Sequence, residues 1–377
     1  MRRVETAIVG GGIAGLACAR RLAEAGREFL LLSDRLGGRL HAADDGLNFG
    51  AAYVTSDYRH VLGFVDRGPR IYMKDVYYWD RDRFISLFHP RNVRRARAVA
   101  RIYRLVYRFR RHFLALRREA GHVCQKTLME RDPLLRRSTE QSAAELVAEH
   151  GLEEIDEVFC APIFHSTLFM PAHRANAFYY LANLFPIWLP TYAVDVRPAV
   201  PRLTRGHGER IQIARVEEIE ETAGGSFLLR SGEGSLAATN LVLAVPGRNG
   251  EELLPGHSAA ANVPFCTLHI RGRRRREVAP GKTVFLRENH PITILWPQPN
   301  GLEIAFAPTV DPDLSPYFER YEIVRAVRWK TAVQLSGAIW RPLQPRPNLF
   351  TIGDHNICGL EDSYLSGLFA ANRIIGP

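Results

Sequence analysis

The first 39 residues contain the pattern that most constrains the fold of this chain. Residues 6–9 form a short apolar run of the length expected for a buried parallel strand. Three glycines follow at once, Gly10, Gly12 and Gly15, in the spacing G-x-G-x-x-G. In such a motif the first glycine permits a tight turn, the second lets the backbone approach a pyrophosphate, and the third lets a helix pack on the strand.

The residues after the glycines complete a β-α-β unit. A helix that starts with Ile13 and Ala14 runs to Gly26, which is suited to a left-handed C-cap, and Phe29 to Leu32 form a second strand. The amide groups at the start of this helix would be directed at a diphosphate. A glycine motif alone is a weak signal, and a glycine-rich turn without a ligand is the alternative. Because strand, helix, cap and second strand are all in place, the unit predicts a dinucleotide site formed by Gly10, Gly12, Ile13, Ala14 and Gly15.

Composition limits the location and the kind of site. The chain has 377 residues, 46% of them hydrophobic, which is enough for one large or two ordinary domains. No apolar run approaches the roughly 18–20 residues of a membrane span. The first strand begins almost at the first residue and leaves no room for a signal peptide, so a cytoplasmic location is expected. The five cysteines show no C-x-x-C or paired spacing, which fits a reducing compartment and argues against structural zinc, so no metal is expected.

The net charge of +10 is carried mostly by arginine. Such an excess fits an acidic small molecule, an anionic membrane surface or a nucleic acid, and it fits equally a GC-rich genome that favours arginine codons. No nucleic-acid-binding motif is found, and no nucleic-acid partner is expected. The charge alone does not choose between these explanations, although the arginine excess would suit a carboxylated substrate.

The end of the second strand leaves two cofactors open. A dinucleotide fold normally has an acid there that binds the adenosine ribose. In this chain that position is Ser33, with Asp34 one residue later, and Ser33 with Arg35 would instead suit the 2′-phosphate of NADP. One of the two, Ser33 or Asp34, is predicted to hold the ribose.

The next residues, Gly37-Gly38-Arg39, distinguish between these cofactors. The stretch resembles the D-R-x-G-G-R segment of the flavin-containing amine oxidase superfamily, which includes monoamine oxidases, protoporphyrinogen oxidases and phytoene desaturases. The resemblance implies that FAD is the cofactor. It also implies that Gly37 and Gly38 let the loop cross the FAD diphosphate and that Arg39 lies beside it.

Three later segments resemble other cofactor-binding parts of the same superfamily. Leu47 to Ala51 resembles the segment in which the backbone passes close to the flavin, here at Gly50 and Ala51. Val216 matches a valine whose backbone holds the adenine. Near the end of the chain, Gly353 and Asp354 match the pair that binds the ribityl or diphosphate region, and a helix over about 362–374, with Leu365 in it, would direct its N-terminus at the flavin. Cys358 lies between them, either as a free thiol or as a covalent flavin attachment.

These matches predict an α/β protein with a discontinuous, Rossmann-like FAD-binding domain. Its parts are residues 1–57, 196–262 and 338–377. A mixed α+β substrate domain is expected from residues 58–195 and 263–337, where the resemblance is nearly absent.

Two arginine-rich stretches of the substrate domain have alternative interpretations. Apolar residues from Val99 to Leu116 recur at steps of three and four, which predicts a helix with one apolar stripe. The stripe could lie on an anionic membrane, giving peripheral contact at the inner membrane face through residues 91–118, or it could lie in the core, which we favour because it is narrow and lacks a tryptophan. Arg273 to Arg276 are predicted to form a solvated turn.

The substrate domain also carries the evidence on chemistry. Many amine oxidases of the superfamily have a lysine near flavin N5, and the matching strand, Phe265 to Ile270, has none. Val327 to Ala332 resembles the R-W-x-x-A segment of the protoporphyrinogen oxidase and desaturase branches, which makes Trp329 and Lys330 the only catalytic candidates, although Trp329 could equally be a packing residue.

We therefore expect an FAD-dependent oxidoreductase that performs C–C desaturation or a porphyrinogen-type oxidation on an acidic or hydrophobic substrate. An amine or amino-acid oxidase that uses O2 is the alternative. A non-catalytic FAD- or NADP-binding sensor or assembly protein is the alternative of another class.

Overall fold

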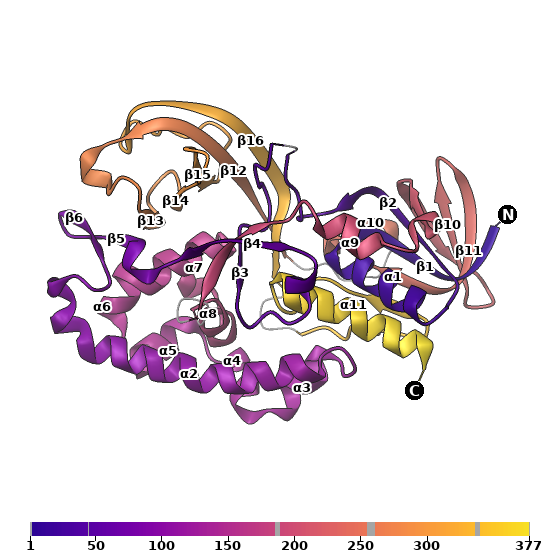
Figure 1. The fold of residues 1–377 in the computed structure, drawn as a ribbon. Coiled ribbons are helices and arrows are strands. Elements are labelled where there is room, and N and C mark those ends of the chain that lie inside the picture. The colour runs from indigo at the N-terminus through magenta and orange to yellow at the C-terminus, as the bar shows by residue number, and fades with distance from the viewer. Residues whose placement is uncertain (1, 44, 185–188, 255–260, 336–339, 377) are drawn as a thin grey trace.

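A computed structural model describes residues 2–43, 45–184, 189–254, 261–335 and 340–376. The described chain has two parts, visible in Figure 1 as a nucleotide-fold half near both termini and a larger half with a second sheet and a layer of helices. Two seven-stranded sheets and one three-stranded sheet form the framework. The protein is thus of mixed α/β class, as predicted.

The first sheet has the strand order β8-β2-β1-β11-β10-β9, and β17 pairs with β11. Strand β1 runs parallel to both β2 and β11, while β10 is antiparallel to its neighbours. All seven strands come from the three separate stretches that were predicted for the cofactor domain. They are β1 (Arg2–Gly12), β2 (Phe29–Gly37), β8 (Ile211–Ile213), β9 (Val216–Glu221), β10 (Phe227–Ser231), β11 (Gly234–Leu243) and β17 (Leu349–Thr351).

Two helices from opposite ends of the sequence lie side by side on this sheet, α1 (Ile13–Glu24) and α11 (Leu360–Ile375). They approach closely because Gly367 of α11 has no side chain: a Cβ atom there would overlap the carbonyl oxygen of Ala14. The contact places α11, the last helix of the chain, beside the glycine motif at Gly10 to Gly15.

The second sheet has the order β16-β12-β15-β14-β13-β5-β6, and its two longest strands, β12 and β16, reach back to the first half of the molecule (Figure 1). The predicted solvated turn at 273–276 is wrong for Arg274. That side chain is 6% exposed, pairs with Glu303 and donates to the carbonyls of Val278, Ala279 and Lys282. The strands are β5 (Val76–Asp80), β6 (Arg83–Ser86), β12 (Ala261–Arg274), β13 (Thr283–Phe285), β14 (Ile294–Pro297), β15 (Glu303–Ala307) and β16 (Phe318–Leu335).

A layer of helices covers one side of the substrate half. Its longest member is α2 (Ala96–Glu119), whose apolar stripe Ile102, Val106, Phe109, Phe113 and Leu116 is buried in the core, so the favoured interpretation of that stripe is confirmed. The other helices are α3 (Gln125–Arg131), α4 (Pro133–Glu140), α5 (Ala143–Glu149), α6 (Glu153–Ile155), a π-helical turn Asp156–Cys160, α7 (Ala161–Leu168) and α8 (Ala177–Leu184).

Short elements connect the two halves. A three-stranded sheet, β3-β7-β4, joins residues before and after the helical layer. These strands are β3 (Tyr53–Thr55), β4 (Asp66–Ile71) and β7 (Thr191–Asp195), and the remaining short elements are η1 (Val61–Gly63), η2 (Met73–Asp75), η3 (Pro90–Arg95), η5 (Ala172–Arg174), α9 (Ala199–Thr204), η7 (Gly208–Arg210), α10 (Gly247–Leu253) and η8 (Arg276–Val278). Among the helices in the described residues, none is both long enough and apolar enough to cross a bilayer.

Candidate active site

The three glycines of the first turn have different surroundings. Gly10 has a φ of +114°, and a Cβ there would lie 2.5 Å from the carbonyl oxygen of Ala244. A Cβ on Gly15 would overlap the carbonyl oxygen of Gly10. A Cβ on Gly12 would meet nothing within 4 Å. Gly10 and Gly15 are therefore required by the fold itself, whereas Gly12 faces open space.

The start of helix α1 leaves its first amide groups available. Gly12 is the N-cap and provides no side-chain acceptor, and the first turn, which contains Ile13 and Ala14, has no acidic residue. The side chains of Ile13 and Ala14 are buried, so this turn presents only backbone N–H groups toward the space in front of Gly12. Unpaired amides at a helix N-terminus favour an anion.

The residues at the end of β2 have separate roles. Ser33 is buried, and its Oγ accepts a hydrogen bond from Gly11 N at 2.9 Å and donates one to the Arg35 carbonyl at 2.6 Å. Asp34 is exposed. The guanidinium of Arg35 lies over the ring of Trp329, 5.5 Å from its centroid. Ser33 thus fixes the loop to the glycine turn, and Asp34 is the candidate with a solvent-accessible carboxylate.

Gly37 and Gly38 carry the loop back across the glycine turn. Both have positive φ, +93° and +55°, and Gly37 pairs with Gly12. A Cβ on Gly38 would lie 3.1 Å from the Cα of Gly12. The two glycine-rich segments are therefore in direct contact, as an arrangement around one diphosphate requires.

Arg39 is the junction of the candidate site. Its Nη1 donates to Asp354 Oδ2 at 2.6 Å and to the Ala332 carbonyl at 2.9 Å. Its own carbonyl accepts from Ala51 N at 3.0 Å, and a Cβ on Gly50 would overlap that carbonyl. Gly50 is therefore needed to pack this loop on Arg39, and this packing accounts for the glycine without a ligand.

The second oxygen of Asp354 extends the network into the substrate half. Gln334 Nε2 donates to Asp354 Oδ1 at 2.9 Å, and Gly247 N donates to Gln334 Oε1 at 2.6 Å. Burial alone would raise the pKa of Asp354, but the adjacent Arg39 guanidinium holds that pKa below its usual value. Gln334 was not predicted. A single amide side chain within the apolar end of a strand does not by itself indicate a contact with a distant aspartate.

Partly buried polar side chains lie around Arg39. Arg39 retains 34% exposure beside an almost fully buried Asp354, and Tyr53 and Cys358 are close enough to influence each other electrostatically. Burial raises the pKa of Tyr53 to about 12, and burial with the nearby Asp354 carboxylate raises the pKa of Cys358 to about 12. A Cβ on Gly353 would meet nothing within 4 Å. The phenol and the thiol beside Arg39 are therefore neutral near pH 7.

An aromatic wall belongs to the same region. Phe169 stacks on Phe265 of β12 with a centroid distance of 4.0 Å, and it meets Phe306 edge-on at 5.4 Å. Phe169 has a left-handed backbone, with a φ of +57°. A non-glycine residue in this conformation is strained, and such strain is concentrated at functional sites.

Strands β12 and β16 hold the predicted flavin-facing loop in place. Thr267 Oγ1 and Trp329 Nε1 both donate to the Phe49 carbonyl, at 2.7 and 2.9 Å. His269 lies edge-on to the Phe49 ring at 4.6 Å, and burial lowers the pKa of His269 to about 4, so its imidazole is neutral near pH 7. Trp329 thus supports the loop rather than only filling the core.

None of the four lysines of the sequence lies at this site. Lys330 is exposed, next to the buried Trp329 on the strand, and Lys74 is exposed as well. Lys282 pairs with Asp75, and Lys126 lies within 3.8 Å of Glu130. In the described residues, no lysine ammonium group is therefore a hydrogen-bond partner of Arg39, Asp354 or the Phe49 carbonyl.

The last two predicted cofactor residues are buried in hydrophobic clusters. Val216 begins β9 and packs in the core of the first sheet, and Leu365 lies in the first half of α11. Their predicted contacts with adenine and flavin stay predictions. No group of three His, Cys, Asp or Glu side chains suited to a metal ion occurs in the part of the chain that the structure describes.

Comparisons with known proteins agree with this geometry. The family model of an NAD(P)-binding Rossmann-like domain matches residues 8–68. A variant of putrescine oxidase is 16% identical with a TM-score of 0.70, covering 99% of both chains. A fatty acid isomerase from P. acnes that produces CLA is 14% identical with a TM-score of 0.70, covering 97% of both. Cyclohexylamine oxidase from Brevibacterium oxydans is 14% identical with a TM-score of 0.62, covering 99% of this chain and 98% of that one.

The family match and the glycine motif define a Rossmann-like dinucleotide-binding fold. More particularly, the whole chain shares the fold of these solved structures, among them putrescine oxidase and cyclohexylamine oxidase. No curated protein sequence matches this chain.

Proposed function

We propose that this protein is an FAD-dependent oxidoreductase. The observation that carries the proposal is the junction at Arg39, where the loop after β2 meets the Gly353-Asp354 segment beside the open space at Gly12. The residues fit FAD: the turn from Gly10 to Gly15 with Gly37 and Gly38 would hold the diphosphate, and Asp354 would hold the ribityl chain. The bound flavin would accept a hydride from the substrate and pass the electrons to an acceptor.

Arg39 is suited to pair with the diphosphate. A guanidinium has five N–H donors, and its bonds to Asp354 and Ala332 use only one terminal nitrogen. Its remaining donors and its 34% exposure leave it able to bind phosphate oxygens. Asp34 would bind the adenosine ribose, because the Ser33 hydroxyl already donates to the Arg35 carbonyl.

For the substrate, we infer a hydrophobic molecule that is oxidised at a carbon–carbon bond or in a porphyrinogen-type reaction, because aromatic side chains lie in the region of the site. The aromatic wall consists of Phe169, Phe265 and Phe306, which can orient an apolar molecule and exclude water. The neighbouring polar groups, Tyr53 and Cys358, are neutral near pH 7. No lysine is among the described side chains that contact Arg39, Asp354 or Phe49, and this also supports a reaction other than amine oxidation.

The test begins with the purified protein. We expect it to contain FAD or to bind added FAD with a shift of the visible flavin spectrum, and protein that binds no FAD would refute the proposal. Anaerobic mixing with polyunsaturated fatty acids, carotenoid precursors and porphyrinogens should bleach the flavin with at least one of them.

A matched pair of variants separates substrate contact from folding. Phe169→Ala shortens the aromatic wall and should slow bleaching about tenfold or more with unchanged FAD content. Phe88→Ala, at a residue 68% exposed, should leave both unchanged. Equal bleaching by wild type and Phe169→Ala would remove this wall from the substrate site.

An amine oxidase is the second candidate, because two of the solved structures with this fold are named as amine oxidases. Rapid bleaching by simple amines or amino acids would favour it and contradict the preference for a carbon–carbon bond. A flavin that binds and is reduced by none of these compounds would instead favour a sensor or assembly role.

A further inference from the structure

A group of large apolar side chains is exposed on the substrate half. Phe88 is 68% exposed and Val93 76%, although side chains of these types are normally covered. Tyr103 and Tyr107 on α2 are about half exposed, and their rings stack with centroids 6.4 Å apart. We call the surface made by these four residues and the adjoining arginines of α2 the α2 face.

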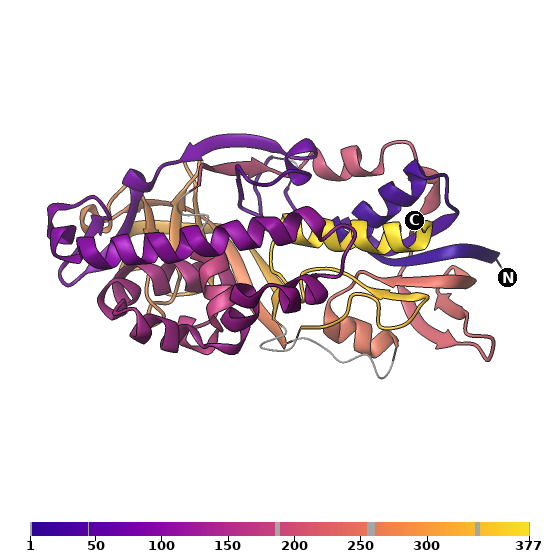
Figure 2. The same cartoon turned by 90° about the horizontal axis from the view of Figure 1, so that it is seen from below.

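This face is not the apolar stripe that the sequence predicted. That stripe begins at Val99, which is partly buried, and its residues from Ile102 to Leu116 are buried in the core. The exposed row lies on another side of the same helix: Ala96, Ala100, Tyr103 and Tyr107 follow one another at steps of four, three and four. Figure 2, viewed from below, shows α2 in front of the other elements.

Exposed arginines border the row. Within the described residues, no ion pair joins any of these side chains to an acid. Neighbouring arginines on the inward side behave differently: Arg95 pairs with Asp80 and Glu154, and Arg117 pairs with Asp57 and Asp362. The acids beside these two side chains are therefore already paired, and the exposed arginines of α2 retain their positive charge. The exposed arginines without an acidic partner are Arg97, Arg101, Arg104, Arg108, Arg111 and Arg118.

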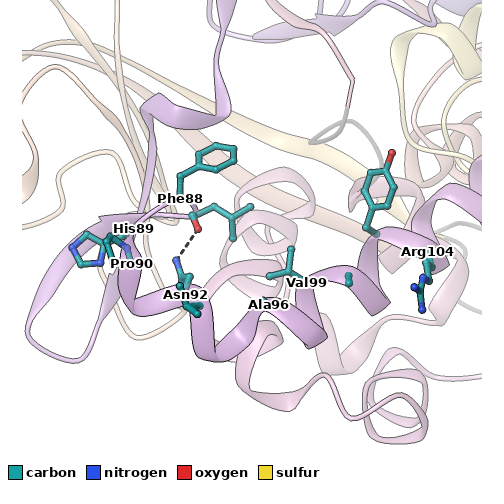
Figure 3. A pocket seen from close by; sticks show the side chains of 11 residues that line it. Phe88, His89, Pro90, Asn92, Ala96, Val99 and Arg104 are labelled. Atoms are coloured by element: carbon teal, nitrogen blue, oxygen red, sulfur yellow. Dashed lines mark hydrogen bonds between the residues drawn. The ribbon is translucent and has the colours of Figure 1, made fainter.

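A groove runs between the loop after β6 and the start of α2. Its volume is about 610 Å³, and Figure 3 shows Phe88, His89 and Pro90 along one side with Ala96, Val99 and Arg104 of α2 along the other. The groove is mostly apolar and ends beside the arginines. A ligand that fits it has an apolar part next to an anionic part.

We propose that the α2 face docks on a membrane surface that contains anionic phospholipids. Acyl chains near the headgroups would accept Phe88 and Val93, and the phosphates would pair with the arginines, as for helices that lie in the membrane interface. Lipid is favoured over a nucleic acid, because a nucleic acid would pair with the arginines but would leave Val93 in water. An acidic protein is the alternative that a failure to bind anionic vesicles would favour.

Vesicle co-sedimentation tests the proposal with the full chain. Binding is expected to vesicles of phosphatidylcholine with phosphatidylglycerol and to be weak with phosphatidylcholine alone, and salt should weaken it. Arg104→Glu with Arg108→Glu should reduce the affinity about tenfold or more. Arg276→Glu with Arg320→Glu reverses two exposed arginines, one on η8 and one on β16. This pair makes the same change in net charge and should have a much smaller effect.

The apolar part is tested separately. Phe88→Ser with Val93→Ser changes only exposed side chains, so folding should be unchanged, and vesicle affinity should fall about tenfold with the salt dependence retained. The proposal is overturned if anionic vesicles do not bind, if the two arginine pairs have equal effects, or if the serine variant binds vesicles as tightly as wild type. The last result would indicate a general polyanion site, and tighter binding to heparin than to vesicles would support that conclusion.

Discussion

At the scale of single residues, Gly12 and Gly15 separate cofactor binding from folding. Gly12→Val should change the free energy of unfolding by no more than about 1 kcal/mol. Residue 12 has an ordinary extended backbone conformation, and the new side chain would face open space. The same side chain would occupy the diphosphate position and should weaken FAD binding at least about tenfold. Flavin content and thermal unfolding measure the two effects.

Substitutions at two other glycines serve as controls. Gly15→Ala should destabilise the fold by about 3 kcal/mol or more, because the new Cβ overlaps the Gly10 carbonyl. Gly63→Val should change neither property, since nothing lies within 4 Å of its Cβ position. If Gly12→Val bound FAD normally, the diphosphate would have to lie elsewhere.

The ion pair of Arg39 and Asp354 gives a prediction about pH. Asp354 is 2% exposed, and its pKa is below the usual value because of Arg39. Its contribution to stability is therefore present above the ordinary carboxyl pKa and is lost as the pH falls through the lowered value. Arg39→Met should lower the free energy of unfolding by about 2 kcal/mol near neutral pH. This is less than the roughly 3–5 kcal/mol for breaking a fully buried pair, because Arg39 is one-third exposed.

The sign of the pH dependence should also change in this variant. Without Arg39, burial raises the pKa of Asp354, so Arg39→Met should lose less stability relative to wild type as the pH is lowered toward about 5. Urea unfolding at several pH values measures this. Arg39→Met with Asp354→Asn should recover stability without recovering FAD binding. A loss that does not vary with pH would show that the pair is not the cause.

Individual residues were predictable where one chemical requirement allows few residue types. The glycines at 10, 15, 37 and 38 are forced by backbone geometry, and a sequence records such requirements directly. Gln334 and Thr267 were missed because their partners, Asp354 and the Phe49 carbonyl, are distant in sequence. A polar residue in a strand does not indicate which way its side chain points until the packing of both halves is known.

At the scale of elements, Glu361 attaches helix α11 to the segment that precedes η1. Its carboxylate accepts from the backbone N–H groups of Arg59, His60 and Val61 and contacts the His60 ring at 2.8 Å. Burial alone would raise the pKa of Glu361, but these donors hold it below its usual value.

Glu361→Gln should therefore destabilise the protein by about 2 kcal/mol, because an amide NH2 group would face backbone donors. The stability from Glu361 is present above the ordinary carboxyl pKa and is lost as the pH falls through the lowered value, so the difference from wild type should shrink in acid. Denaturant midpoints against pH measure it, with Glu24→Gln on an exposed pair as the control. A difference that persists in acid would contradict a role for the carboxylate charge.

Elements with local signals were predicted better than those without them. The long helix α2 was expected from its apolar spacing, and its buried face is the predicted one. Helix α5 begins at Ala143 as a separate helix after α4, which ends at Glu140, because Ser142 and Glu145 form a capping box. The exposed row on α2 was not expected, since arginines and tyrosines alternate there without an apolar period.

At the scale of the whole molecule, the candidate site joins Arg39 to segments that lie 293 and 315 residues later in the chain. Arg39, Gln334 and Asp354 belong to the loop after β2, to β16 and to the end of β17. Nothing local in the sequence states that these segments meet. Only the resemblance to a known superfamily placed the first and last of them together, and it was nearly absent from the substrate half.

A ligand that spans such an interface should stabilise the entire protein. FAD at a hundredfold excess over its Kd should add about 2.7 kcal/mol and raise Tm by about 2 °C or more, since it binds only the folded chain. FMN lacks the ADP half that the turn at Gly12 would hold, so at equal concentration it should stabilise much less. Gly12→Val should abolish the shift by FAD. A larger shift with NADP than with FAD would show that Ser33 and Arg35 bind a 2′-phosphate, and the flavin assignment would then be wrong.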